Sequence, residues 1–377
     1  MKDRHRILIL GLTITSSWGN GHATTYRALV RELGRRRHDV LFLERDAEWY
    51  ASNRDLPAPP YGRTIIYGSV AELKDRFARE VREADLVIVG SYVPEGIAIG
   101  EWVCAAARGV TAFYDIDTPV TLASLAAGTC TYLTAALIRR YDLYLSFTGG
   151  PTLERLERDH GARMARALYC SFDPATYHPE QREPRWDLGY MGTFCPSRQP
   201  HLDRLLVEAA RRSAAHRFVV AGPGYATERW PSNIEYRSHV AARDHRAFYT
   251  AQRYTLNLTR ADMIRAGYSP SVRLFEAAAC GVPIISDSWP GLDTLFRPGK
   301  EIVISGSATD TLRLLTEISE RDRVAIGRRA RRRVLAEHTA EHRAIQLEEY
   351  LDDARRHARL WTSQLSAERT RVSPAVS

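Results

Sequence analysis

Residues 6–34 read RILILGLTITSSWGNGHATTYRALVRELG, and this stretch decides the fold. From Arg6 to Gly11 it forms a short apolar run that ends in glycine, which is typical of a buried strand. Apolar residues then repeat at helical spacing from Gly21 to Gly34. The order of strand, glycine-containing loop and helix indicates one unit of a parallel α/β sheet.

The same alternation continues outward from this unit through the first half of the chain. Further short apolar runs predict strands at residues 40–43, 64–67, 85–90, 110–114, 143–147 and 167–170. Amphipathic stretches between them predict helices at residues 70–82, 97–107 and 122–132. Continuous apolar strands that alternate with helices form a parallel sheet that is covered on both faces.

The second half starts the alternation again after a segment rich in proline and charge. Strands are predicted at residues 188–191, 217–222, 234–236, 254–258 and 283–286, and helices at 201–212, 245–252, 271–279 and throughout 308–359. The 377 residues exceed what one hydrophobic core usually spans. We therefore expect a first domain at residues 1–172, a linker at 173–186, a second domain at 187–340, a terminal helix at 341–360 that packs back towards the first domain, and a tail at 361–377.

The composition excludes several classes of protein. Hydrophobic residues make up 44% and charged residues 26%, as in soluble globular proteins, which argues against a disordered chain. No apolar run reaches the roughly 18 residues of a spanning helix, and the short run after the charged N-terminus fits a strand better than a signal peptide. Five scattered cysteines without a CxxC pair favour a reducing cytoplasm over a disulfide framework or a zinc site. The net charge of +8 favours anionic partners.

The richest chemistry lies in residues 267–283, which read GYSPSVRLFEAAACGVP. Ser269 suits the N-cap of a short helix, Pro270 its first position and Gly281 its end. Arg273 would then lie near the positive end of the helix dipole, which costs about 0.3–1 kcal/mol unless an anion lies between them. A pyrophosphate would be such an anion.

Glu276 follows Arg273 by three residues and shares its helical face. A carboxylate at that position can accept hydrogen bonds from two ribose hydroxyls. The pair therefore indicates a nucleoside diphosphate, and the alternative is a surface Arg–Glu pair at helical spacing.

Three segments together resemble GT-B glycosyltransferases, most closely the CgeB-like branch of the family-1/family-4 type. They are SVRLFEAAACGVPII at 271–285, GYMGT at 189–193, and His338-Thr339 with Arg343. The resemblance spans most of the chain and implies an α/β protein of two Rossmann-like, doubly wound domains that face a cleft. It implies that Glu276 binds the nucleotide ribose and that the helix start, with Ser271 and Val272, holds the diphosphate. No cofactor is expected besides the nucleotide sugar as co-substrate.

One position departs from the family. Retaining family-4 enzymes carry an E-x7-E pattern, and its first acidic position falls on Tyr268 here. The anomeric outcome of the reaction therefore stays open.

Other donor contacts are expected at the ends of strands in the second half. Arg260 follows the strand at 254–258 and is a candidate phosphate ligand. Gly192 in the GYMGT segment, and Gly222 and Gly224 after the strand at 217–222, are candidates for close approach to the donor. The alternative for the last two is a plain tight turn.

The loop before His22 is expected on the acceptor side. It contains glycines but is not G-x-G-x-x-G, and no P-loop lysine follows it. The resemblance assigns this loop to the acceptor and likens His22 to the histidine base of inverting members, since an imidazole accepts protons near neutral pH. The alternative is a histidine that caps or packs the helix. The candidate acceptor contacts on the loop are Ser17, Gly19, Asn20 and Gly21.

Two carboxylates, Asp115 and Asp117, follow the strand at 110–114 and would point to opposite sides of an extended chain. We favour Asp117 as a second candidate base and Asp115 as an acceptor-side contact, with helix capping as the alternative. No further His or Asp cluster accompanies the pair, so no metal site is predicted.

The run RRARRR at 328–333 lies on a predicted helix. A solvated helix face is the simpler interpretation, and contact with a membrane surface or nucleic acid is the alternative. Nucleic acid is not favoured, because aromatic residues do not alternate with the basic ones.

These observations predict a cytoplasmic, metal-independent glycosyltransferase. It would move a sugar from a UDP-, dTDP- or GDP-linked donor to a hydroxyl of a glycan, lipid, small molecule or protein, with peripheral membrane contact as an open option. The alternatives are a GT-B-like sugar-nucleotide epimerase or phosphorylase, and a degenerate nucleotide-binding partner protein.

Overall fold

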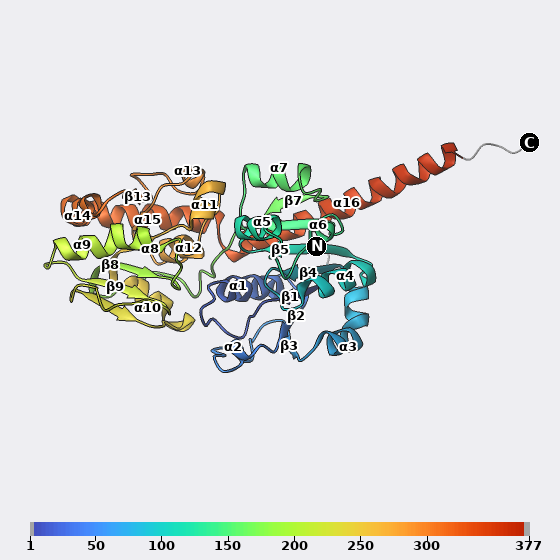
Figure 1. Ribbon diagram of the computed structural model, residues 1–377, viewed down its shortest axis with the longest axis horizontal. Coiled ribbons are helices and arrows are strands. Elements are labelled where there is room, and N and C mark those ends of the chain that lie inside the picture. Colours follow the sequence, from blue (N-terminus) through green and yellow to red (C-terminus); the bar gives the residue numbers. More distant parts are fainter. Residues whose placement is uncertain (1–3, 373–377) are drawn as a thin grey trace, which may run out of the picture.

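The computed structural model describes residues 4–372, with side chains for residues 4–357. Two parallel sheets with helices on both faces lie side by side (Figure 1). The first sheet has the strand order β3-β2-β1-β4-β5-β6-β7. Its strands are β1 (Arg6–Gly11), β2 (Asp39–Arg45), β3 (Arg63–Tyr67), β4 (Leu86–Gly90), β5 (Val110–Asp115), β6 (Leu143–Ser146) and β7 (Ala165–Ala167).

The first sheet is built around β1, whose apolar run packs on both faces. Ile9 lies in register with Phe42 of β2 and Ile88 of β4, and all three side chains are fully buried. The helices of this domain are α1 (His22–Arg35), α2 (Glu48–Ala51), α3 (Val70–Glu83), α4 (Gly96–Ala106), α5 (Thr118–Ala126), α6 (Ala135–Ile138) and α7 (Pro151–Arg158).

The second sheet has the order β10-β9-β8-β11-β12-β13. Its strands are β8 (Trp186–Met191), β9 (Phe218–Ala221), β10 (Ile234–Arg237), β11 (Gln252–Asn257), β12 (Ile284–Ser286) and β13 (Val303–Ile304). Its helices are α8 (Gln199–Leu202), which continues through a π-helical stretch into α9 (Glu208–Arg212), α10 (His245–Thr250), α11 (Ala261–Ala266), α12 (Val272–Ala279), α13 (Leu292–Leu295), α14 (Ala308–Glu317) and α15 (Glu320–Glu337). The predicted linker at 173–186 falls between the two sheets, apart from its last residue.

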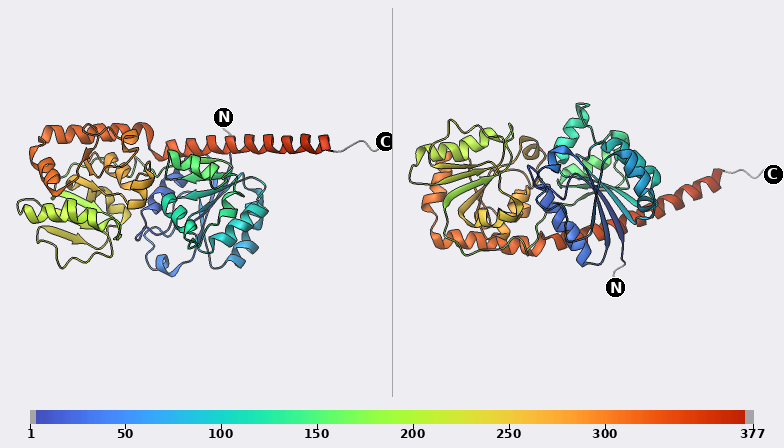
Figure 2. Two further views of the ribbon diagram at one scale, coloured as in Figure 1. Left: turned by 45° about the horizontal axis from the view of Figure 1, so that its top comes forward. Right: turned by 90° about the horizontal axis from the view of Figure 1, so that it is seen from below.

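The last helix, α16 (Ala340–Val372), leaves the second domain and runs along the first, as Figures 1 and 2 show. Glu348 fixes it there through an ion pair with Arg36 (2.6 Å) and a hydrogen bond accepted from His38 Nε2 (2.9 Å), and both of these residues follow α1. The helix continues through residues 361–372 of the expected tail, because the sequence offers no glycine or proline between Ala340 and Pro374. The rest of that tail, residues 373–377, lies outside the described residues.

Several boundaries differ from the sequence-based expectation. The expected helix at 122–132 is α5, which begins at Thr118 and ends before Gly128, whose φ of 69° breaks the helix. The segment 308–359 is divided among α14, α15 and α16, since Ser319 caps α15 through its hydroxyl. The strand expected at 167–170 is β7, and it ends at Ala167.

Within the described residues, none of the helices combines the length and the apolar character that crossing a membrane requires.

Candidate active site between the domains

A cavity of about 530 Å³ lies between the two domains. Its walls are the loops after β1 and β5 of the first domain, the loops after β8, β9 and β11 of the second, and the first turn of α12. Both sheets reverse their strand order beside β1 and beside β8, and open α/β sheets bind ligands at such points. Most of the predicted site residues line this cavity: Ser17, Gly19, Asn20, Gly21, His22, Asp117, Gly192, Gly222, Arg260, Ser271, Val272, Arg273 and Glu276.

Helix α12 begins at Val272, two residues later than a cap at Ser269 would place it. The expected N-cap at Ser269 is therefore wrong. Its hydroxyl instead pairs with that of Thr148 in the first domain (2.8 Å), a contact that no local pattern encodes. Ser271 occupies the N-cap position but donates its hydroxyl to Asn257 Oδ1 (2.8 Å), so it does not cap the helix amides.

Arg273 lies in the first turn of α12 and is buried, and that turn contains no acidic residue. Its Nε donates to Met191 O (2.7 Å) and its Nη1 to Asn257 Oδ1 (3.0 Å). The guanidinium also stacks on the ring of Tyr190, 4.7 Å from its centroid. Among the described side chains, no carboxylate forms an ion pair with Arg273. The groups that contact its guanidinium are all neutral, so its positive charge is not compensated. The wall of the cavity is therefore strongly attractive to an anion at this point.

Glu276 is buried one turn further along α12 and touches both domains. Its Oε1 accepts a hydrogen bond from the Thr24 hydroxyl (3.0 Å), and its Oε2 accepts one from the Tyr249 hydroxyl (3.0 Å). His245 Nδ1 lies 3.8 Å from Oε2. A carboxylate has about four acceptor positions, so these two hydrogen bonds leave capacity for a further hydroxyl.

Two more arginines reach the cavity. Arg260 Nη1 forms an ion pair across the cavity with Asp117 Oδ2 (3.0 Å), which also accepts a hydrogen bond from the Tyr92 hydroxyl (3.1 Å). Arg198 donates through Nη2 to Thr193 O (2.7 Å), and its buried Nε has no hydrogen-bond partner among the described residues. Sequence reasoning missed Arg198, because no motif marks its position after the loop that follows β8.

His22 is the first residue of α1. Its Nδ1 is buried and has no hydrogen-bond partner within the described part of the chain, and its ring lies 5.6 Å from that of Phe147. Burial lowers the pKa of His22, Asp117 opposes that shift and Arg260 adds to it. The imidazole is therefore neutral at pH 7 and able to accept a proton.

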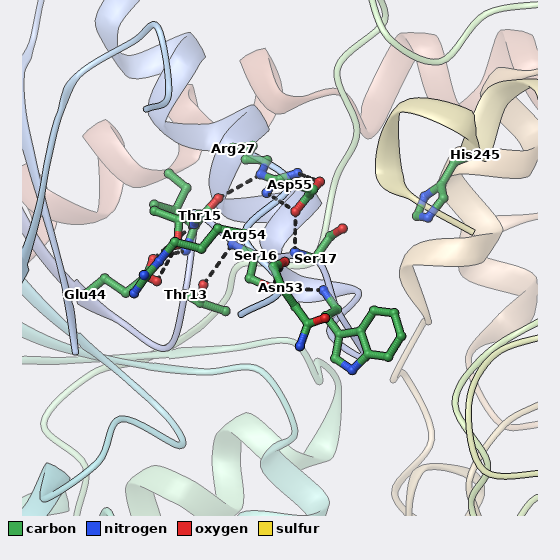
Figure 3. A network of polar contacts seen from close by, with 12 residues as sticks. Thr13, Thr15, Ser16, Ser17, Arg27, Glu44, Asn53, Arg54, Asp55 and His245 are labelled. Atoms are coloured by element: carbon green, nitrogen blue, oxygen red, sulfur yellow. Dashed lines mark hydrogen bonds and ion pairs between the residues drawn. The ribbon is translucent and has the colours of Figure 1, made fainter. Parts of the chain in front are cut away.

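Two carboxylates, the buried Glu44 and the more exposed Asp55, fix the loop between β1 and α1, and sequence reasoning missed them (Figure 3). Glu44 accepts hydrogen bonds from the amides of Ile14 (2.7 Å) and Thr15 (3.0 Å). Asp55 accepts one from the amide of Ser17 (2.7 Å) and binds Arg27 through two contacts of 2.9 Å. The sequence carries one signal for Glu44, because this acidic residue directly follows the apolar run of β2. These contacts hold the backbone of the loop rigidly in place.

Asp115 and Gly224 are predicted site residues that do not line the cavity. Asp115 is fully buried and accepts hydrogen bonds from the hydroxyls of Tyr144 (2.5 Å) and Thr121 (2.8 Å), which turn it away from the cavity. Burial raises its pKa to about 6. Gly224 instead packs on Phe194, which would lie 3.1 Å from a Cβ at that position.

Gly192 and Gly222 allow two loops of the second domain to approach closely. A Cβ on Gly222 would lie 2.1 Å from Gly192 O, and Gly222 has a φ of 138°. Only glycine fits there without a shift of the backbone. This contact shapes the cavity wall beside Arg273, whose Nη2 would lie 2.9 Å from a Cβ on Gly192.

Tyr268, at the position of the first acid of E-x7-E, joins the two domains. Its ring lies against Gly150 of the first domain and Gly291 of the second, where a Cβ would approach ring carbons to 2.4 Å in each case. Its carbonyl accepts a hydrogen bond from the amide of Gly149 (2.9 Å). The side chain is not part of the cavity lining.

Three of the five arginines in the basic run on α15 form hydrogen bonds within the second domain. Arg329, Arg331 and Arg333 donate to the carbonyls of Lys300, Ala279 and Leu295, respectively. Arg328 and Arg332 are exposed. The run thus stabilises the domain more than it forms a basic face.

Comparisons with known proteins agree with this geometry. Residues 198–349 match the family described as Glycosyl transferase-like. None of the curated proteins compared with the chain matches it.

Within the described residues, no three His, Cys, Asp or Glu side chains lie together in a group that could hold a metal ion.

The similar solved structures cover nearly the whole chain. Sucrose-phosphate synthase from Thermosynechococcus elongatus matches with a TM-score of 0.66 and 14% identity, over 96% of this chain and 100% of that one. Anabaena HepE in complex with UDP and glucose matches with a TM-score of 0.68 and 14% identity, over 93% and 100%. An alpha-glucosyltransferase in complex with UDP-glucose and DNA matches with a TM-score of 0.68 and 13% identity, over 93% and 100%.

These likenesses confirm the predicted fold. The chain has the GT-B fold, and its residues 198–349 are similar to the Glycosyl transferase-like family.

Proposed function

We propose that the protein transfers a sugar from a nucleoside diphosphate donor to a hydroxyl of an acceptor bound in the cavity between the domains. The observation that carries this proposal is Arg273, a buried cation without a carboxylate partner in the first turn of α12, at the wall of the cavity. UDP is the favoured nucleotide, because HepE and the alpha-glucosyltransferase are described in complex with UDP or UDP-glucose. The cytoplasm stays our expectation for the compartment, on the basis of the scattered cysteines.

The donor half of the reaction needs stabilisation of the departing diphosphate. The bond from the anomeric carbon to a diphosphate oxygen breaks, and negative charge gathers on that oxygen. Arg273, Arg260 and Arg198 with the free amides of α12 would meet this charge directly. We therefore propose a reaction that proceeds without a metal ion.

The acceptor half needs a base that removes the hydroxyl proton as the acceptor oxygen bonds to the anomeric carbon. Asp117 is engaged by Arg260 and Tyr92, whereas Nδ1 of His22 is buried, unpartnered in the described structure and neutral at pH 7. We therefore propose His22 as the base and Asp117 as the carboxylate that orients Arg260.

Turnover after exhaustive dialysis against EDTA tests the proposed function. We expect release of UDP from a UDP-sugar that depends on an added acceptor and persists in excess EDTA, with dTDP- and GDP-sugars as comparison donors. Activity that is lost in EDTA and restored by magnesium or manganese would contradict the metal-independent part. Nucleotide binding without acceptor-dependent release from any donor would instead indicate a binding protein.

A further inference from the structure

One buried carboxylate, Asp287, contacts the wall of the cavity without lining the cavity itself. It directly follows β12 and is 4% exposed. Its Oδ2 accepts a hydrogen bond from the backbone amide of Thr259 (2.8 Å), and its Oδ1 accepts one from the Thr259 hydroxyl (2.8 Å). Within the described residues no arginine or lysine forms an ion pair with it, and Nδ1 of His201 lies 3.6 Å from Oδ2. Burial of such a carboxylate is costly, so the hydrogen bonds that it accepts have to stabilise it.

The two hydrogen bonds from Thr259 fix the chain directly before Arg260. Thr259 is 6% exposed and lines the cavity. Arg260 is the N-cap of α11, where its backbone is extended (φ −66°, ψ 149°). Because the amide and the hydroxyl of Thr259 both bind one carboxylate, the backbone from which the Arg260 side chain leaves has little freedom to move. Asp287 therefore fixes the point from which this guanidinium enters the cavity.

A chain of hydrogen bonds joins the same carboxylate to Arg273. The guanidinium of Arg273 only donates, so the Asn257 atom that it contacts at 3.0 Å is the oxygen Oδ1. Nδ2 of Asn257 then donates to Ser286 Oγ (3.0 Å). The hydroxyl proton of Ser286 is left for Asp287 Oδ1 (3.4 Å). Every donor in the chain therefore points towards Asp287.

The members of this chain of hydrogen bonds are shielded from water. Asn257 and Ser286 are fully buried, and Arg273 is 6% exposed. Hydrogen bonds are stronger in such an environment, and a charged acceptor at the end of a chain polarises the bonds that lead to it. Without the charge of Asp287, the Ser286 proton is free to turn elsewhere, and the Asn257 oxygen is held less firmly towards Arg273.

We propose that Asp287 is a positioning residue that holds Arg260 and Arg273 in the arrangement that binds the diphosphate of the donor. It reaches one arginine through the backbone and the other through the chain of hydrogen bonds. Glu276, the expected ligand of the ribose, is held separately by the hydroxyls of Thr24 and Tyr249. Asp287 therefore acts on the phosphates of the donor and not on its nucleoside. This inference rests on the proposed function of the same cavity.

The ratio between the affinities for UDP and UMP tests this inference, because only UDP carries the second phosphate. Both affinities are measured by calorimetric titration. We expect the wild type to bind UDP more tightly than UMP, and Asp287→Asn to reduce that ratio by about tenfold or more. An effect on stability alone would lower both affinities by the same factor and leave the ratio as it is in the wild type.

Asp187→Asn is the matched control. Asp187 lies near the start of β8, whereas the cavity lies beyond the other end of that strand, and it does not line the cavity. Like Asp287, it accepts hydrogen bonds from a backbone amide, that of Arg217 (2.9 Å), and from a side chain, that of Arg253 (3.1 Å). We expect both substitutions to lower the thermal midpoint, and Asp187→Asn to change the ratio by less than about threefold.

Ser286→Ala is a second variant, which keeps the charge of Asp287 and both of its hydrogen bonds from Thr259. It cuts only the chain to Arg273 and leaves Asn257 Nδ2 unpaired. We expect it to reduce the ratio of UDP to UMP affinity by about threefold or more. Because it removes one hydroxyl and introduces no new group, it tests the chain even where Asp287→Asn does not fold.

The outcomes separate this inference from the proposed function. A wild-type ratio retained in either Asp287→Asn or Ser286→Ala, or an equal fall in Asp187→Asn, would overturn the positioning role and leave the donor proposal standing. Equal affinities of the wild type for UDP and UMP would also overturn it, because the second phosphate would then not be held. A wild type that binds neither nucleotide would overturn the proposed function itself.

Discussion

His22→Ala should lower the turnover number by about 10²–10⁴-fold and leave UDP affinity unchanged, because a base acts on the acceptor and not on the nucleotide. The ring of His22 lines the cavity with a buried nitrogen that has no partner among the described residues. Turnover by UDP release and UDP affinity by calorimetry are the measurements. Asp117→Asn is the comparison, and we expect a smaller loss from it, since Asp117 is already bound to Arg260 and Tyr92.

The pH dependence of turnover is a second test of His22 as the base. Only the neutral imidazole accepts a proton, and burial lowers the pKa of His22 from its usual 6.5. Turnover should therefore be independent of this group at pH 7 and above, and should fall as the pH drops through the lowered pKa. A loss of turnover that is larger for Asp117→Asn than for His22→Ala, with UDP affinity held, would make Asp117 the base.

Arg273→Lys should lower turnover by about 10²–10³-fold, the loss typical when one preorganised donor to a developing negative charge is removed. Lysine keeps the charge but cannot donate to Met191 O and Asn257 at once while it stacks on Tyr190. The charge would therefore leave the position it holds beside the first turn of α12.

Arg331→Lys is the matched control for that variant. Arg331 donates to Ala279 O at the other end of α12, far from the first turn, and does not line the cavity. Both changes are expected to lower the thermal midpoint, so the informative quantity is turnover measured well below it. Equal losses of turnover in the two variants would show that Arg273 acts only through the stability of α12.

Local patterns in the sequence predict much of the fold, because each strand of a buried parallel sheet is a continuous apolar run. The run at β1 is the clearest example, since both of its faces are covered. Helix ends are less predictable where tertiary contacts decide them. Ser269 is a good cap by residue type, but its hydroxyl pairs with Thr148, which lies 121 residues away along the chain.

The residues of the candidate site likewise divide into those that local sequence predicts and those that tertiary contacts decide. Residues in or at the end of the loop that follows a strand, such as Asp117 and His22, are predictable because the carboxyl ends of parallel strands meet at one edge. The side on which a carboxylate points is not predictable to the same degree. Asp115 turns inward because Tyr144 and Thr121, from β6 and α5, meet it there. Asp55 holds the loop through a long-range contact with Ser17 that leaves no local signal. Arg198 lines the cavity from a loop that no sequence motif marks.

The central claim is that the start of α12 binds a nucleoside diphosphate with its ribose at Glu276. Calorimetric titration of the wild type and Glu276→Gln with UDP, 2′-deoxy-UDP and 3′-deoxy-UDP tests it most directly. We expect UDP to bind the wild type about tenfold more tightly than at least one deoxy analogue, and Glu276→Gln to bind that analogue and UDP alike. An unchanged preference for the ribose hydroxyl in Glu276→Gln, or equal binding of all three nucleotides by the wild type, would contradict the account.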